Sequence, residues 1–226
     1  MASLLMPGCN NMLMYTRSMK RLGEYLAEKG AIDGIAGCCK PSNTAYQEIP
    51  EGTDLIVICN TCSAIANESL GCHSVTHAFD IILNDDDFTY PDYDGEEITV
   101  QDCWRARGNH ELHDAVRELL RHMNFDIVEL EENRDSSRFC GTATLMPLPQ
   151  TSMEFAPQQL GDHDPSLFVS HSEEDRRRLM REHVSKITTP RVVSYCTVCD
   201  KGLTLGGADS ASLINLLFDT LMLPQS

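Results

Sequence analysis

Apolar positions in the first part of the chain follow two patterns, short continuous runs and a longer run at helical spacing. The stretch 3–6 is short and apolar, which predicts a strand. A helix is expected over residues 11–29, because apolar residues recur there every three or four positions. The run 55–58 is continuous, apolar and rich in β-branched residues, which is typical of a strand buried in a parallel sheet.

The same order of elements returns in the second half of the chain. Residues 98–100 predict a strand and residues 109–123 a helix with one apolar face. Two further strands are expected over 125–130 and 191–195, and a terminal helix over 208–221. An internal duplication is the simplest account of this repetition. We therefore expect an α/β protein of two pseudo-symmetric Rossmann-like halves with parallel strands, built on strand–helix alternation.

The two repeats differ in length and are separated by an acidic stretch. Residues 1–83 form the first repeat, and residues 84–97, rich in aspartate and turn residues, are predicted to be a linker. The second repeat, 98–226, carries an insertion at 142–190 with a proline-rich part and a predicted helix over 172–186. A lid or docking surface and a tolerated surface elaboration are both open interpretations of this insertion.

Composition and charge exclude some classes of function. The 226-residue chain has a formal net charge of −16, which argues against nucleic acid and against anionic membrane surfaces as partners. No apolar run approaches the ~18 residues needed to cross a bilayer, so no direct membrane insertion is expected. The N-terminal stretch lacks the basic region of a signal peptide, which predicts a cytoplasmic location.

Ten cysteines need a chemical explanation, because disulfides are rare in cytoplasmic proteins. Nine of them fall in two sets with the same order, and each set ends in a CxxC pair that follows a predicted strand. The first set is Cys9, Cys38, Cys39, Cys59 and Cys62, and the second is Cys103, Cys140, Cys196 and Cys199. Cys72 fits neither set and is interpreted as an ordinary thiol.

The position of these cysteines predicts a metal-binding function. Parallel sheets bind ligands beyond the carboxyl ends of their strands, where both sets are expected to converge. The CxxC pairs also lie at predicted helix N-termini, where the helix dipole favours thiolate over thiol. Thiolates are the soft ligands that iron–sulfur clusters require. The sequence therefore predicts that each set can hold a metal centre.

The motifs around these cysteines resemble those of a known family. They read Pro7-Gly8-Cys9, Cys38-Cys39, Cys59-x-x-Cys62, Asp102-Cys103, Phe139-Cys140-Gly141 and Cys196-x-x-Cys199. This pattern resembles the duplicated cysteine-rich CCG domain of the heterodisulfide reductase B subunit, which also occurs in iron–sulfur subunits of lactate, glycolate and anaerobic glycerol-3-phosphate oxidising enzymes. The resemblance covers nearly the whole chain.

The resemblance implies an iron–sulfur oxidoreductase subunit that transfers electrons to or from a disulfide or a small organic substrate. A complete set of five cysteines implies a non-cubane [4Fe-4S] cluster, which here would make Cys9, Cys38, Cys39, Cys59 and Cys62 the ligands and, through the cluster, the catalytic residues. Phe139 stands where the family's second motif has another cysteine, so the second cluster is expected to be cubane, altered or absent. Cys39 is followed by Lys40 and Pro41 instead of the family's glycine.

Partners are implied by what the chain lacks. It has no closely spaced CxxCxxC run of a ferredoxin domain and no glycine-rich dinucleotide fingerprint. A ferredoxin-like iron–sulfur subunit and a flavoprotein subunit are therefore expected to exchange electrons with it. Two alternatives stay open, a zinc-stabilised structural or interaction module with Cys₄ sites and a thioredoxin-like dithiol protein that uses Cys59 and Cys62.

A few charged and imidazole side chains near the cysteines have weaker claims to a functional role. Arg105 and Arg107 follow Cys103 and can neutralise cluster charge, although a solvated loop is the alternative. His110 and His113 are one turn apart on the predicted helix, where surface histidines are the ordinary interpretation. His73 and His77 are expected to have structural roles.

Overall fold

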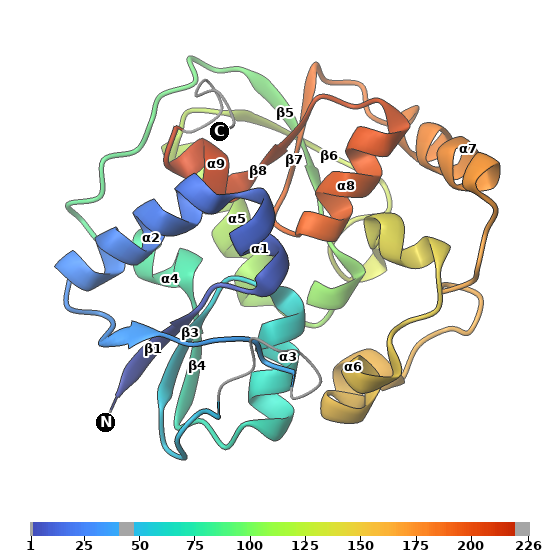
Figure 1. The fold of residues 1–226 in the computed structure, drawn as a ribbon. Coiled ribbons are helices and arrows are strands. Elements are labelled where there is room, and N and C mark those ends of the chain that lie inside the picture. The colour runs from blue at the N-terminus through green and yellow to red at the C-terminus, as the bar shows by residue number, and fades with distance from the viewer. Residues whose placement is uncertain (1, 41–47, 220–226) are drawn as a thin grey trace. The chain divides into compact units, whose positions relative to one another are not determined.

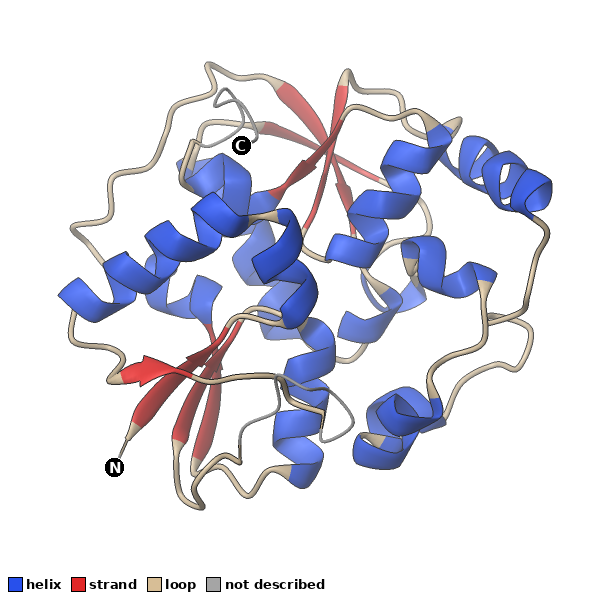
Figure 2. Ribbon diagram, viewed as in Figure 1, coloured by secondary structure: helices blue, strands red, loops and turns tan. Residues whose placement is uncertain are grey.

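The computed structural model describes residues 2–40 and 48–219 and has an α/β architecture (Figure 2). Two four-stranded, all-parallel sheets are each flanked by helices, which confirms the predicted fold class of two Rossmann-like halves. The chain divides into two compact units. The first unit comprises Met1–Asp85 and Pro149–His163, and the second comprises Asp86–Leu148 and Asp164–Ser226.

The sheet of the first unit has the strand order β2-β1-β3-β4 (Figure 1). Its strands are β1 (Ser3–Met6), β2 (Gly34–Ile35), β3 (Asp54–Val57) and β4 (Ser74–His77). The helices that accompany them are α1 (Cys9–Met14), α2 (Thr16–Glu28), α3 (Asn60–Ser69) and α4 (Ala78–Leu83). The two central strands pair along their length, with Leu5 opposite Ile56, and their apolar side chains are buried in the core.

The sheet of the second unit repeats this topology, with the order β6-β5-β7-β8. Its strands are β5 (Glu97–Gln101), β6 (Asp126–Glu129), β7 (Arg191–Ser194) and β8 (Ser210–Ser212). Its α-helices are α5 (His110–His122), α7 (Glu173–Val184), α8 (Thr197–Gly206) and α9 (Leu213–Leu217), and its 3₁₀ turns are η1 (Trp104–Ala106), η2 (Arg134–Ser136) and η3 (Gly141–Leu145). In each sheet the first strand of the repeat, β1 or β5, is therefore the second strand in the order. It pairs with the strand that precedes the CxxC pair, which is β3 or β7.

Two helices differ from the prediction. The helix expected over 11–29 is divided between α1 and α2, because Tyr15 leaves the helical region with φ −125°. The terminal helix expected over 208–221 is wrong. Gly207, at φ +93°, ends α8 with a left-handed cap, which glycine adopts without a steric cost. The chain then pairs with β7 as strand β8 and continues as α9, and residues 220–221 of the expected helix lie outside the described part of the chain.

The stretch 142–190 contributes to both units. Helix α7 confirms the helix expected over 172–186 and packs closely on α8, where a Cβ added to Gly206 would lie 2.5 Å from the Met180 carbonyl oxygen. Helix α6 (Gln150–Phe155) and the turn η4 (Pro157–Gly161) instead belong to the first unit and lie beside α3 (Figure 1). The Glu68 carboxylate on α3 accepts hydrogen bonds of 2.9 Å from the backbone N–H groups of Gln158 and Gln159.

From Asp86 on, the acidic stretch 84–97 is part of the second unit. The Tyr93 ring stacks on Phe125 with 4.4 Å between ring centroids, and its hydroxyl donates to the Leu216 carbonyl oxygen at 3.0 Å. Within the described residues, the structure contains no helix with the length and apolar character needed to cross a membrane.

Candidate metal centres

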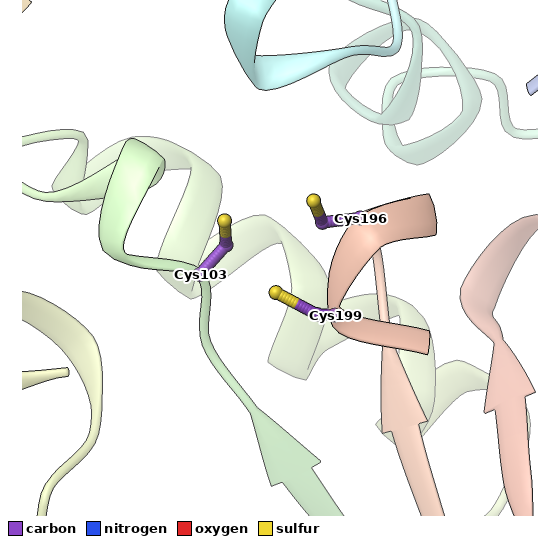
Figure 3. A group of neighbouring side chains, drawn as sticks. All are labelled: Cys103, Cys196 and Cys199. Atoms are coloured by element: carbon purple, nitrogen blue, oxygen red, sulfur yellow. The ribbon is translucent and has the colours of Figure 1, made fainter. Parts of the chain in front are cut away.

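The second unit brings its four cysteines together at the carboxyl ends of its two central strands. Cys103 follows β5, while Cys196 follows β7 and caps α8, and Cys199 lies in the first turn of α8. The sulfur atoms of these three residues converge from the two segments and lie within 4.8 Å of one another (Figure 3). The Sγ atom of Cys140 lies 3.8 Å from that of Cys103.

This geometry can hold a metal ion. A tetrahedral zinc–thiolate centre with Zn–S bonds of ~2.3 Å places its sulfur atoms roughly 3.8 Å apart. The Cys103–Cys140 separation matches that spacing. Cys103, Cys140 and Cys199 are buried and Cys196 is partly exposed, so the group has one open side.

Gly141 allows Cys140 to reach the CxxC turn. Its φ is +51°, and a Cβ atom added there would lie 1.8 Å from the carbonyl oxygen of Val198. Gly202, one turn further along α8, is also in close contact, since a Cβ added there would lie 2.5 Å from the Gly141 Cα. Any side chain at position 141 would push the Cys140 loop away from Cys199, so this glycine is required by the shape of the centre.

A buried carboxylate fixes both strand ends that carry the cysteines. Asp102, next to Cys103, accepts two hydrogen bonds from the Arg117 guanidinium, at 2.9 and 2.6 Å. It also accepts one from the hydroxyl of Tyr195, next to Cys196, at 2.8 Å. Arg117 bonds in addition to Glu129 on β6, at 2.7 and 2.8 Å. One charged network therefore ties β5, β6 and β7 together directly below the thiols.

The ionisation of this network follows from its pairing. Burial would raise the pKa of Asp102, but the hydrogen bonds and charge of Arg117 outweigh burial and hold that pKa below its usual value. Burial and the adjacent Asp102 carboxylate raise the pKa of the Tyr195 hydroxyl well above its usual value. The network therefore consists of an ionised carboxylate, a guanidinium and a neutral phenol, which is the state that stabilises the fold.

The pKa values of the four thiols in the second unit are shifted in opposite directions. Hydrogen bonds from Cys103 and Cys199 lower the pKa of Cys140 and of Cys196, and the positive charge of Arg105 acts in the same direction. The same sulfur contacts together with burial raise the pKa of Cys103 and Cys199. Arg107 has a different role, because its guanidinium lies 3.9 Å from the centre of the Trp104 ring.

Phe139, the residue before Cys140, lies in an aromatic stack. Its ring lies 3.9 Å from that of His183 on α7, at an interplanar angle of 13°. The His183 Nε2 atom lies 2.5 Å from Oε1 of Gln101 at the end of β5. Burial lowers the pKa of His183 to about 4, so the stacked imidazole is neutral at pH 7.

The first unit brings its five cysteines together at the corresponding edge of its own sheet. Cys9 begins α1 after β1, Cys38 and Cys39 follow β2, Cys59 caps α3, and Cys62 lies in the first turn of α3. Their thiols make hydrogen-bond contacts in three pairs, Cys38 with Cys9, Cys62 with Cys39 and Cys62 with Cys59. This string of contacts is more extended than the compact trio of the second unit.

Gly8 has the same steric role in the first unit that Gly141 has in the second. It adopts φ +80°, and an added Cβ would lie 2.8 Å from the Cβ of Cys59. The turn that carries Cys9 can therefore lie directly against the turn that carries the CxxC pair.

Ionisation differs among the first-unit thiols. Burial and the hydrogen bond that the Cys38 thiol donates to Cys9 raise the pKa of Cys38 to about 12. The hydrogen bond from Cys62 lowers the pKa of Cys39, and the nearby Lys40 adds to this effect. Lys40 is itself held by a 2.5 Å hydrogen bond from its Nζ to the Ser152 hydroxyl on α6.

The first centre offers the donors of a sulfur-ligated metal group, although among the described residues no three of its thiols share the 4.8 Å spacing of Cys103, Cys196 and Cys199. Its donor set consists of thiols, the ligands that iron–sulfur clusters require. Asn60, between Cys59 and Cys62, is buried, and neither its Nδ2 nor its Oδ1 has a hydrogen-bond partner among the described residues. A buried amide without a partner costs free energy, so a bound group within hydrogen-bond reach of Asn60 would stabilise it.

The remaining cysteine and two histidines of the first unit lie outside this centre. Cys72 is partly exposed, and desolvation raises its pKa. His73 Nδ1 lies 2.8 Å from the Asp54 carboxylate, and His77 caps α4 by accepting a hydrogen bond from the Phe79 N–H at 3.3 Å. Both histidines therefore have structural partners.

Comparison with known proteins does not identify a family for this chain. A scan against protein-family models finds no matching family, and searches of curated proteins and of solved structures find no match.

Proposed function

We propose that this chain is an iron–sulfur, electron-transferring oxidoreductase subunit of the heterodisulfide reductase B type. In this proposal Cys9, Cys38, Cys39, Cys59 and Cys62 hold a non-cubane four-iron cluster, which accepts and donates single electrons. The observation that carries the proposal is the gathering of these five thiols at one edge of a parallel sheet, with four more at the equivalent edge of a second sheet of the same topology.

The protein's own residues have defined roles in this proposal. The N-terminus of α3 favours the thiolate forms of Cys59 and Cys62. The Asn60 amide is available to donate a hydrogen bond to a sulfur atom of the bound group, an interaction that tunes reduction potential in iron–sulfur proteins. The substrate is a disulfide or a small organic molecule, and a ferredoxin-like subunit and a flavoprotein exchange electrons with the chain.

The second centre supports an additional candidate, a single tetrahedral ion such as zinc. Each of the four ligands of a cubane four-iron cluster binds a different iron atom, whereas the four ligands of a single ion surround one point. The 3.8 Å separation of the Cys103 and Cys140 sulfur atoms matches the single-ion spacing. In this version the first centre performs the redox chemistry and the second stabilises the fold.

Anaerobic purification with metal and sulfide analysis tests both parts of the proposal. The protein is expected to be brown, to contain iron and acid-labile sulfide, and to give an electron paramagnetic resonance signal in one redox state. The Cys39→Ser variant is expected to lose the first-centre signal and its iron. Cys72→Ser is the matched control in the same unit and is expected to retain both, because Cys72 lies outside the centre.

Three results would contradict the proposal in different ways. A colourless protein with zinc in both centres would favour the structural module. Metal-free protein that reduces disulfides through Cys59 and Cys62 would favour the dithiol protein. Unchanged iron content and spectrum in Cys39→Ser would remove the first-centre assignment.

A further inference from the structure

A further group of metal-ligating side chains lies at the start of α5, formed by His110, His113 and Asp135. One ligand atom from each of the three residues lies within 4.8 Å of the others. His110 and His113 are one turn apart on the helix, and Asp135 comes from the turn η2. None of these residues belongs to the two cysteine sets.

His113 is the observation that points to a ligand. Its side chain is completely buried, with 0% exposed area, although the sequence suggested a surface position. Neither of its ring nitrogens has a hydrogen-bond partner within the described residues. Its Nδ1 lies 3.8 Å from Oδ1 of Asp135, which is too far for a hydrogen bond. Buried imidazole nitrogens normally have partners, so this arrangement needs an explanation.

The carboxylate of Asp135 is held in position between the two imidazoles. The backbone N–H of Gly108 donates to its Oδ1 at 2.8 Å, and Oδ2 lies 3.3 Å from Nε2 of His110. Two nitrogen or oxygen ligands at ~2.1 Å from a tetrahedral ion are roughly 3.4 Å apart. The separations of 3.3 and 3.8 Å around Asp135 are close to that value.

We propose that His110, His113 and Asp135 bind a divalent metal ion of the zinc class at a third centre. Two imidazoles and one carboxylate are a donor set for such borderline ions, and they leave a coordination position for water or another ligand. His110 is 69% exposed, so an ion can enter from solvent on that side, while the buried His113 supplies the inner ligand.

The site is joined to the network that supports the second cysteine centre. The main-chain oxygen of His113 accepts a 3.0 Å hydrogen bond from Arg117, the residue that pairs with Asp102. A metal ion bound at His113 would therefore fix the first turn of α5 against η2. The inference does not depend on the proposed function, because its ligands contain no sulfur.

Zinc titration of the purified full-length protein tests this site, with Zn²⁺ itself as the probe. Wild-type protein is expected to bind one more zinc per chain than the His110→Ala and Asp135→Asn variants. Loss of one ligand is expected to weaken binding at least as much as the roughly 10–100-fold effect of losing an outer-shell partner. His110 and Asp135 are suited to substitution because both are partly exposed, and circular dichroism checks that the variants fold.

His122→Ala is the matched control, because His122 is a partly exposed histidine on the same helix, in its last turn. It is expected to retain the wild-type zinc content. X-ray absorption at the zinc edge separates this site from the cysteine centres, since the extra zinc should have only nitrogen and oxygen neighbours. Equal zinc binding in wild type, His110→Ala and Asp135→Asn, or zinc surrounded by sulfur alone, would overturn the inference whether or not the cysteines hold iron.

Discussion

The shape of the second cysteine centre depends on the absence of a side chain at Gly141, and replacing this residue with alanine tests that dependence. The new Cβ would lie 1.8 Å from the Val198 carbonyl oxygen, far inside van der Waals contact, so the Cys140 loop or the start of α8 must move. Overpacking of this kind costs about 1–3 kcal/mol. The left-handed φ of +51° adds about 1–2 kcal/mol for a residue with a Cβ. We expect Gly141→Ala to lower the free energy of unfolding by about 2–5 kcal/mol.

The matched control is Gly207→Ala, which isolates the conformational cost. Gly207 also has a positive φ, +93°, but no neighbouring atom lies within 4 Å of an added Cβ. Only the cost of the left-handed backbone, about 1–2 kcal/mol, is expected there. Urea unfolding measures the difference between the two variants. Metal content is the second readout, since only Gly141→Ala separates Cys140 from Cys199. Equal destabilisation of the two variants, with equal metal content, would refute the steric reasoning.

Two further predictions concern the groups around the second centre. Arg117→Met should lower the free energy of unfolding by about 3–5 kcal/mol, because it leaves the buried Asp102 carboxylate without its charged partner. Arg121→Met, which removes an exposed pair with Glu118, should change the free energy of unfolding little. Urea unfolding compares the two variants, and equal effects would contradict the network. The free energy of unfolding should also fall as the pH drops from about 6.5 towards 4, because His183 has a pKa lowered to about 4 in the folded protein and takes up a proton more readily when unfolded. The urea midpoint should therefore fall less between pH 7 and pH 5 in His183→Phe than in the wild type. An identical fall in both proteins would contradict the assignment.

The sequence predicted those strands that carry a clear apolar pattern. The runs at 3–6, 55–58, 98–100, 125–130 and 191–195 correspond to β1, β3, β5, β6 and β7 to within one or two residues. The sequence did not predict β2, β4 and β8. These strands lie outside the central pair, they contain only two to four residues, and Ser74–His77 and Ser210–Ser212 are largely polar. Such segments gain their conformation from pairing with a neighbour and not from their own periodicity.

The supporting residues of the site were also beyond the reach of sequence reasoning. The cysteines were visible because their spacing repeats, but Arg117 lies on a helix face where arginine is normally solvated. Nothing near it in the sequence indicates Asp102 and Glu129 as partners, since these residues meet only through the pairing of β5 with β6. His113 was also assigned to the surface, because histidines on a helix face are normally solvated. That the cysteines bind a metal, and which metal, stays a prediction, because thiol positions alone are compatible with iron or zinc.

The placement of residues 149–163 has a consequence for how the protein is made. Helix α6 and the turn η4 pack on α3, but in the chain they come after β5, α5 and β6 of the second unit. A ribosome must therefore synthesise well into the second repeat before the first can be completed. A fragment that stops at residue 85 would leave the Glu68 carboxylate without its two backbone donors, so the two repeats cannot be separated by a single cut in the gene.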